Sequence, residues 1–262
     1  MITFLKLGGS LITDKNVPHT SRPDVIRRLA DEIYSAWEPQ KSPLLIGHGS
    51  GSFGHVPAKK FGTRNGVSTL PQWQGFAEVH AEAAALNHIV TTILREAGLP
   101  ILSFMPMNCI RSSNGKIISW DTNVLRECFE RQLIPLIFGD TIFDDLLGGT
   151  IYSTEDLFVH LCSVFPEPPR ILLAGLEEGV WNDFPEKRNF LHEIHASEPG
   201  DDRFILGSAS TDVTGGMHEK VYLMKKLVMN HQAQSALIFS GEKPGNLLNA
   251  LNGEKVGTSV LR

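Results

Sequence analysis

Short apolar runs alternate with longer amphipathic stretches along most of the chain. The apolar runs predict strands at Thr3–Leu7, Leu44–Ile46, Ile101–Phe104, Leu133–Phe138, Arg170–Ala174 and Ala236–Phe239. The amphipathic stretches, with apolar residues at helical spacing, predict helices at Pro23–Trp37, Gln72–Ala97, Thr122–Arg131, Thr154–Ser163 and Met217–His231. Strands and helices that take turns imply an α/β protein, a three-layer αβα sandwich whose open central sheet is mostly parallel.

Two stretches interrupt this alternation. Gly115–Trp120 resembles one arm of a β-hairpin, and Thr141–Ser153 resembles a hairpin closed at Gly148 and Gly149. The chain contains no low-complexity linker, internal repeat or block of like charge. We therefore expect residues 1–262 to form a single domain.

Composition narrows the possible partners. With 24 Lys and Arg against 29 Asp and Glu, the net charge of -5 argues against a nucleic-acid binder but allows a local cationic pocket. The three scattered cysteines, Cys109, Cys128 and Cys162, suggest neither a disulfide framework nor a zinc site. No apolar run approaches the roughly 18 residues of a membrane span. We expect a cytoplasmic protein that binds neither nucleic acid nor membrane.

A glycine-rich segment, Gly47–His55 (GHGSGSFGH), follows the apolar run Pro43–Ile46. It fits the dinucleotide pattern G-x-G-x-x-G, which needs a helix directly after the glycines and an acidic residue about 20 positions later. Pro57, Gly62 and Gly66 follow instead, and no apolar strand ends near position 70. The segment is better interpreted as a loop whose backbone N–H groups bind another anion, with His55 as a further donor, although a plain connection is also possible.

Two more glycine loops carry lysines. KLGGS (Lys6–Ser10) lies at the end of the first predicted strand, with Lys15 just beyond it, and TDVTGGMHEK (Thr211–Lys220) opens a helix. Loops at strand ends of an open α/β sheet meet over one edge, so the three lysines suggest a ligand with several phosphates. The Walker loop and the protein-kinase signatures are absent from the sequence.

These motifs resemble the amino acid kinase superfamily, whose members open with K-x-G-G-S and bind ATP with a later G-G-M-x-x-K loop. The ending GSFGH, together with Gly139-Asp140 before a hairpin, is similar to the isopentenyl phosphate kinases of that superfamily. The resemblance implies transfer of the γ-phosphate of ATP to isopentenyl phosphate, with Mg²⁺ carried by ATP, and a homodimer. It also implies an acceptor-binding lobe at about 1–165 and a nucleotide-binding lobe at about 166–262.

Site residues follow from the resemblance, position by position. Catalytic roles are implied for Lys6, Lys15, His55 and Lys220. Acceptor contacts are implied for Gly49, Ser50, Gly54, His55, Gly139 and Asp140, and ATP contacts for Lys6, Gly8, Gly9, Ser10, Gly51, Gly179, Asp212, Gly215, Gly216 and Lys220. No protein ligand for the metal is expected, because magnesium often binds mainly through phosphate and water.

Some positions stay open. The family's T-D-V-D-G-V-Y reads GLEEGVW here (Gly175–Trp181), which leaves the nucleoside contacts undefined, and S-G-D reads STED, in which Glu155 or Asp156 replaces the acid. For the isopentenyl tail, one face of the predicted helix Gln72–Ala97 offers Phe76, Val79 and Ala83, bordered by Trp73 and Trp120. Ordinary core packing explains Phe76, Val79 and Ala83 equally well.

Other functions are compatible with the same motifs. One is a relative with a different acceptor, such as a fosfomycin kinase or a uridylate kinase. Another is a non-catalytic binder of nucleotides or oxyanions on the same fold, which predicts loss of the catalytic lysines. Lys6, Lys15 and Lys220 are all present, so a kinase is favoured.

Overall fold

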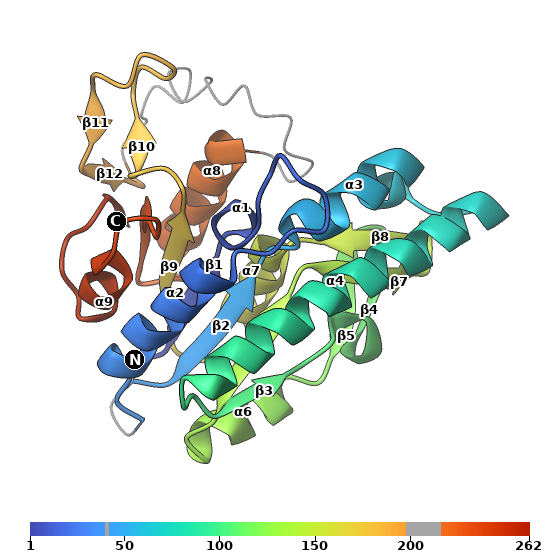
Figure 1. The fold of residues 1–262 in the computed structure, drawn as a ribbon, viewed down its shortest axis with the longest axis horizontal. Helices are drawn as coiled ribbons and strands as arrows, with labels where there is room; N and C mark the ends of the chain where they lie inside the picture. Colours follow the sequence, from blue (N-terminus) through green and yellow to red (C-terminus); the bar gives the residue numbers. More distant parts are fainter. Residues whose placement is uncertain (40–41, 198–215) are drawn as a thin grey trace.

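A large twisted sheet forms the centre of the protein (Figure 1). The structure is a computed structural model, and it describes residues 1–39, 42–197 and 216–262. Within these residues the sheet has eight strands in the order β12-β14-β13-β9-β1-β2-β6-β3. Their bounds are β1 (Thr3–Leu7), β2 (Leu44–His48), β3 (Ile101–Ser103), β6 (Ile134–Phe138), β9 (Arg170–Gly175), β12 (Glu193–His195), β13 (Ser235–Ser240) and β14 (Thr258–Leu261).

The six neighbouring strands β13, β9, β1, β2, β6 and β3 run parallel to one another. Strand β14 pairs antiparallel with β13 and parallel with β12. Parallel strands bury both faces, and every residue of β1 and β6 is buried. All six strands predicted from the sequence are confirmed, with ends that shift by at most two residues. The mostly parallel sheet is confirmed with them.

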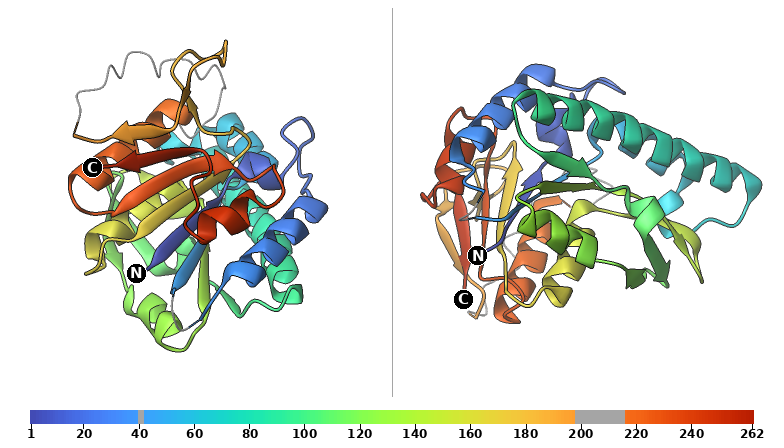
Figure 2. Two further views of the ribbon diagram at one scale, coloured as in Figure 1. Left: turned by 90° about the vertical axis from the view of Figure 1, so that its left-hand side faces the viewer. Right: turned by 90° about the horizontal axis from the view of Figure 1, so that it is seen from below.

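Helices cover the two faces of the sheet in separate layers (Figure 2). One apolar core joins the sheet to α1 (Gly9–Ile12), α2 (Pro23–Ala36), α4 (Leu70–Glu96) and α9 (Asn246–Leu251). A second core joins the other face to α6 (Asn123–Glu130), α7 (Thr154–Val164) and α8 (Gly216–Met229). The predicted αβα sandwich and its five helices are therefore confirmed. Of the helices described, none is both long and apolar enough to cross a membrane.

The two stretches that interrupt the alternation form a separate four-stranded sheet beside the main one. Its strands are β4 (Ile110–Ser113), β5 (Lys116–Trp120), β7 (Asp140–Asp144) and β8 (Gly148–Tyr152), in the order β5-β4-β7-β8. The turn predicted at Gly148 and Gly149 is wrong, because both residues lie in β8 and the chain reverses at 145–147. The Asp144 carboxylate fixes that earlier turn by accepting hydrogen bonds from the N–H groups of Leu146 and Leu147.

The glycine segment is more regular than the sequence suggests. It continues into α3 (Gly51–Phe61), so the expectation that no helix follows the glycines is wrong. Pro57 lies inside α3, where its missing N–H removes one hydrogen bond but does not end the helix. Gly62, at a φ of 63°, ends it in the left-handed conformation. The short helices η1 (Thr63–Asn65) and α5 (Pro106–Cys109) and the small pair β10 (Val180–Trp181) and β11 (Phe190–Leu191) complete the described elements.

Candidate active site

A cleft of about 580 Å³ lies where β1, β2 and β9 end, at the carboxyl edge of the parallel strands. Its walls come from the loops after β1, β2, β6 and β9 and from the first turns of α3, α7 and α8. The predicted site residues that line it are Lys6, Gly8, Gly9, Ser10, Lys15, Gly49, Ser50, Gly51, His55, Gly139, Gly179, Gly216 and Lys220. Three loops far apart in the sequence thus meet in one cavity.

Two of these loops touch through their glycines. A side-chain carbon placed on Gly9 would lie 2.7 Å from the Cα of Gly51, and one on Gly49 would lie 2.9 Å from the nitrogen of Gly9. Any larger residue would push the loops apart. Gly51 also has a φ of 50°, a conformation that side chains disfavour. The glycines bring the loop after β1 against the loop after β2, which concentrates backbone groups at the floor of the cleft.

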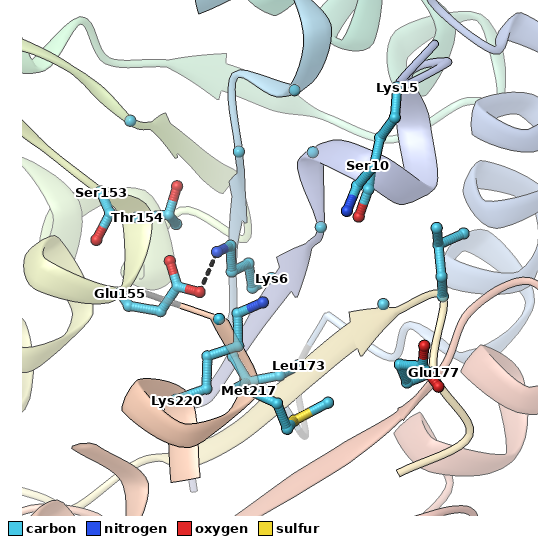
Figure 3. A pocket seen from close by; sticks show the side chains of 18 of the residues that line it. Lys6, Ser10, Lys15, Ser153, Thr154, Glu155, Leu173, Glu177, Met217 and Lys220 are labelled. Atoms are coloured by element: carbon cyan, nitrogen blue, oxygen red, sulfur yellow. Dashed lines mark ion pairs between the residues drawn. The ribbon is translucent and has the colours of Figure 1, made fainter. Parts of the chain in front are cut away.

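Lys6 is held in the cleft by a buried carboxylate. Its amine, on β1, forms an ion pair with Glu155 in the first turn of α7 (Figure 3). Both residues are more than nine-tenths buried. Burial alone raises the pKa of the Glu155 carboxyl, but the charges of Lys6 and Lys220 outweigh it and hold that pKa below its usual value.

This ion pair decides the choice left open by the STED segment. Glu155 faces the cleft, whereas Asp156 takes part in capping α7: its Oδ2 accepts hydrogen bonds from Ser153 N at 2.8 Å and Ser153 Oγ at 2.7 Å. Asp156 also lies 3.4 Å from Arg64. Glu155 is therefore the acid on the cleft, and Asp156 stabilises the helix that presents it.

The cationic side chains approach the cleft from different elements. Lys220 extends from the first turn of α8 towards Lys6, and Lys15 extends from the loop after α1 beside Ser10 (Figure 3). Among the described residues, Glu155 and Glu177 are the carboxylates that line the cleft; Glu155 pairs with Lys6, and Glu177 lies 2.6 Å from Lys187. The cleft therefore keeps a positive character although the whole chain is acidic, as binding of polyanions requires.

His55 and Val56 of α3 line the cleft, and so does Ile151 of β8. Beneath them, the buried His48 ring lies 3.1 Å from the carbonyl oxygen of Gly49 and stacks on Phe138. Burial lowers the pKa of His48, against the hydrogen bonds to Gly49 and Asn87. The site combines phosphate-binding groups with a short apolar wall.

Five predicted acceptor residues do not line the cleft: Gly54, Phe76, Val79, Ala83 and Asp140. Phe76, Val79 and Ala83 are buried in α4, where Phe76 contacts Trp73 and Phe143, so core packing is their role in this structure. Trp120 stacks on His160 instead of bordering the cleft. The face of α4 predicted to hold the tail is a face that packs on the protein in this structure.

Asp140 is fully buried and acts on its neighbours. It accepts hydrogen bonds from Thr141 N at 2.8 Å and Met107 N at 3.4 Å, and its carboxylate lies 2.9 Å from Nδ1 of His80 on α4. The bond to Asp140 raises the pKa of His80. Gly54 lies in α3, where an added side chain would collide with Ser50. Asp212 and Gly215 lie outside the described residues.

Several residues on the cleft were not predicted. The hydroxyl of Thr154 donates to the His48 carbonyl at 2.6 Å and joins α7 to the end of β2. Four apolar residues also line the cleft: Leu176, Trp181, Phe184 and Met217. The capping signal at Ser153 marks the start of α7, but only the three-dimensional arrangement shows that this helix points at the cleft.

No group of three or more His, Cys, Asp and Glu residues within the described ranges is arranged to hold a metal ion. Glu155 already neutralises Lys6, so it is a weak candidate ligand. A divalent ion that arrives with a nucleotide and keeps phosphate and water ligands fits this set of residues.

The sequence model of the Amino acid kinase family matches residues 1–240. The chain belongs to this family. It is 33% identical to an isopentenyl phosphate kinase from Methanocaldococcus jannaschii over 99% of this chain and 98% of that protein. An isopentenyl phosphate kinase from Methanothermobacter thermautotrophicus is 32% identical over 98% of each chain.

A solved structure of isopentenyl phosphate kinase has the same fold. It superposes with a TM-score of 0.80 at 27% identity, over 99% of this chain and all of that one. A glutamate 5-kinase from Clostridium perfringens matches at 23% identity over 97% of this chain and 93% of that protein. The full-length relatives named for isopentenyl phosphate are therefore more similar to this chain than that amino acid kinase is.

Proposed function

We propose that this protein transfers the γ-phosphoryl group of ATP to isopentenyl phosphate, giving isopentenyl diphosphate and ADP. The observation that carries the proposal is the cationic cleft, in which Lys6, Lys15, Lys220 and His55 surround glycine loops next to an apolar wall. Near-full-length relatives at 33% and 32% identity are isopentenyl phosphate kinases, which supports the same acceptor here.

The transfer is direct and in line. An oxygen of the acceptor phosphate attacks the γ-phosphorus of ATP, the bond from that phosphorus to the β,γ-bridging oxygen breaks, and ADP leaves with the electron pair. A phosphate monoester has a second pKa of about 6, so its attacking oxygen is already anionic and needs no strong base. The barrier lies in bringing two anions together, and lysines with glycine-loop amides lower it by positioning and charge neutralisation.

On the nucleotide side, we assign Lys6, Gly8, Gly9, Ser10, Gly51, Gly216 and Lys220 to the ATP phosphates. Lys15 stabilises the charge on the transferring group. Gly179 and its apolar neighbours Trp181, Phe184 and Met217 line the part of the cleft best suited to the nucleoside. Magnesium, when bound, offsets charge on the ATP phosphates and is held by them and by water.

On the acceptor side, we assign Gly49, Ser50 and Gly139 to the phosphate through backbone groups, with His55 as a side-chain donor. The exposed Val56 and the half-buried Ile151 give the isopentenyl tail an apolar wall. The first part of the chain, to about 165, then binds the acceptor, and the remainder binds most of the nucleotide. We also propose that the protein acts in the cytoplasm as a homodimer.

A panel of acceptors tests the proposal. Purified protein with Mg²⁺ and ATP is assayed for ADP release with isopentenyl phosphate, dimethylallyl phosphate, fosfomycin and UMP. We expect the highest kcat/KM with isopentenyl phosphate and little turnover of fosfomycin or UMP. Preferred turnover of fosfomycin or UMP would reassign the acceptor, and no acceptor-dependent ADP release would leave a nucleotide binder.

A further inference from the structure

Within the described residues, the loop that carries Lys15 (residues 14–20, here the Lys15 loop) is anchored first at its base. Thr13 and Ser21 form an isolated β-bridge, and Asp14 N donates to the Thr20 carbonyl at 2.9 Å. The side chain of Thr13 is itself held between Gly9 O at 2.7 Å and Ser52 N at 3.0 Å. Beyond this base, Lys15 to Pro18 are exposed.

Contacts from the tip to the rest of the protein converge at His19 and Thr20. The bonds from His19 N to Ser52 O and from Thr20 N to Ser52 Oγ are long, at 3.4 Å each. The shortest contact is between His19 Nδ1 and Oε2 of Glu82 on α4, at 2.6 Å. The His19 ring also meets the edge of Phe53, with ring centres 5.9 Å apart.

The backbone of His19 is consistent with a positional role. Its φ of 54° lies in the left-handed region, which non-glycine residues enter at a cost and in which His is enriched among them. In this conformation the imidazole contacts Glu82 on α4, and His19 does not line the cleft. It therefore holds the loop without meeting substrate.

We infer that His19 and Glu82 are positioning residues that fix the Lys15 loop over the cleft and so set the place of the Lys15 amine. The inference rests on the proposed function, because it needs Lys15 to act on the transferring phosphoryl group. An exposed ion pair contributes only about 0–1 kcal/mol to stability. A displacement of a catalytic group by about 1 Å, in contrast, lowers a rate by up to about 10²-fold. The pair should therefore affect turnover far more than folding.

The first experiment compares His19→Ala, Glu82→Ala and Glu82→Gln with the wild type, using isopentenyl phosphate and ATP. We expect the two alanine variants to lose between about 5- and 50-fold in kcat, with the KM for isopentenyl phosphate within about twofold. Glu82→Gln keeps an oxygen that accepts the bond from His19, so it should retain most of the activity. The midpoint of thermal unfolding should fall by less than about 3 °C.

A matched control lies on the same helix. Glu96 of α4 forms an exposed pair with Arg27 of α2 at 3.1 Å, and neither residue lines the cleft. Glu96→Ala should keep wild-type kcat. Loss of activity in Glu96→Ala equal to that in Glu82→Ala would mean that α4 surface charge matters in general, and it would overturn the inference.

The second experiment asks whether His19 acts through Lys15. Lys15→Ala should be slow, and adding His19→Ala to it should lower kcat by less than about twofold, because the effects of coupled residues do not add. A full His19→Ala loss in the Lys15→Ala background, or wild-type kcat in His19→Ala alone, would overturn the inference. Where Lys15→Ala is too slow to measure, Glu82→Gln and Glu82→Ala test the inference. Activity kept in Glu82→Gln and lost in Glu82→Ala supports it, and equal loss in both overturns it.

Failure of the proposed function gives a different result. In that case the wild type itself does not phosphorylate isopentenyl phosphate, whatever His19 does. If the wild type is active and Lys15→Ala has the same kcat, Lys15 has no catalytic role. The positioning role of His19 and Glu82 is then also refuted.

Discussion

At the scale of single residues, the site depends on which side chains line the cleft. His55 lies in α3, on a cleft wall that also contains an exposed aliphatic side chain, Val56. Under the proposed function, a donor placed there would meet the acceptor phosphate, and the aliphatic side chain would meet its tail. The proposed role of His55 is to contribute a hydrogen bond, which another donor of similar length should replace in part.

Substitution of His55 tests that role. We expect His55→Gln to keep part of the activity, because its amide still donates a hydrogen bond, and His55→Ala to lose at least about tenfold in kcat/KM for isopentenyl phosphate. The KM for ATP should change little in either variant. Wild-type turnover by His55→Ala would contradict the assignment of this side chain to the acceptor phosphate.

Glu155 offers a second test at this scale. In Glu155→Gln the buried Lys6 amine loses its partner carboxylate, which we expect to lower the free energy of unfolding by about 1–3 kcal/mol at pH 7. Bound ATP supplies negative charge in its place, so the gap between variant and wild type should narrow when ATP is added. Thermal unfolding with and without ATP measures both effects.

The pH dependence of this difference has a definite sign. The pKa of Glu155 in the folded protein lies below its usual value, so the carboxylate stabilises the protein above the pKa of the unfolded chain, about 4.3. The stabilisation is lost as the pH falls through the folded-state pKa. Equal unfolding midpoints for variant and wild type at pH 7 without ATP would refute the account.

At the scale of elements, the Asp144 carboxylate connects two hairpins. It accepts hydrogen bonds from the N–H groups of Asn114, Gly115, Leu146 and Leu147, all between 2.9 and 3.0 Å, and from the hydroxyl of Ser112 at 2.8 Å. Burial opposes ionisation, but these bonds hold the pKa of Asp144 far below its usual range. The turns of β4–β5 and β7–β8 are thus held by a single charged side chain.

We expect Asp144→Asn to lower the free energy of unfolding by about 2 kcal/mol at pH 7, since the amide turns a donor towards N–H groups that need an acceptor. The loss should be full above pH 5 and should shrink as the pH falls below about 3.9, the usual pKa of Asp. Chemical denaturation at pH 7 and pH 3 measures it. Exposed Asp145, which pairs with Arg111 at 3.1 Å, supplies the control variant Asp145→Asn. A loss in Asp145→Asn as large as that in Asp144→Asn would contradict this role.

The elements also show what the sequence can predict. Strands and helices with strong apolar periodicity are predicted almost to the residue, because burial of a regular face determines them. α3 is missed since Gly51, Gly54 and Pro57 suggest a loop, and tertiary contacts overcome their poor helix propensity. The hairpin turn is predicted too late in the chain because Gly148 is a typical turn residue. The side chain that fixes the turn is Asp144.

The candidate site is likewise only partly predictable from the sequence. The lysines and glycines of the three loops that are named as site residues follow from motifs that resemble a known family, and the cleft contains those that lie in the described residues, apart from Gly54. The tail-binding face is not predictable by periodicity, because Phe76, Val79 and Ala83 have the pattern of any buried helix face. Nor can local sequence separate Glu155 from Asp156, whose directions differ by the rotation of one helical residue.

At the scale of the whole molecule, α2 near the start of the chain is linked to α9 near its end. β13 contributes Ile238 and Phe239 to the cleft, and the segment after it runs back to α2. There the buried carboxylate of Glu32 accepts hydrogen bonds from the N–H groups of Gly245, Leu247 and Leu248 at 3.1 Å each. Residues more than 200 positions apart thus form the cap of α9.

Glu32 is also paired with Arg28, at 2.6 Å between Nη1 and Oε1, and Arg28 donates to the Gly241 carbonyl at 2.6 Å. We expect Glu32→Ala to lower the free energy of unfolding by about 3 kcal/mol, because the three N–H groups and the half-buried guanidinium lose their acceptor together. The unfolding midpoint should fall by about 6–12 °C, on the basis of about 2–4 °C for each kcal/mol in a domain of this size. Glu96→Ala, at an exposed pair on the same side of the sheet, should shift it by less than about 3 °C. If the two variants unfold at the same temperature, the long-range cap of α9 does not contribute to the stability of the fold.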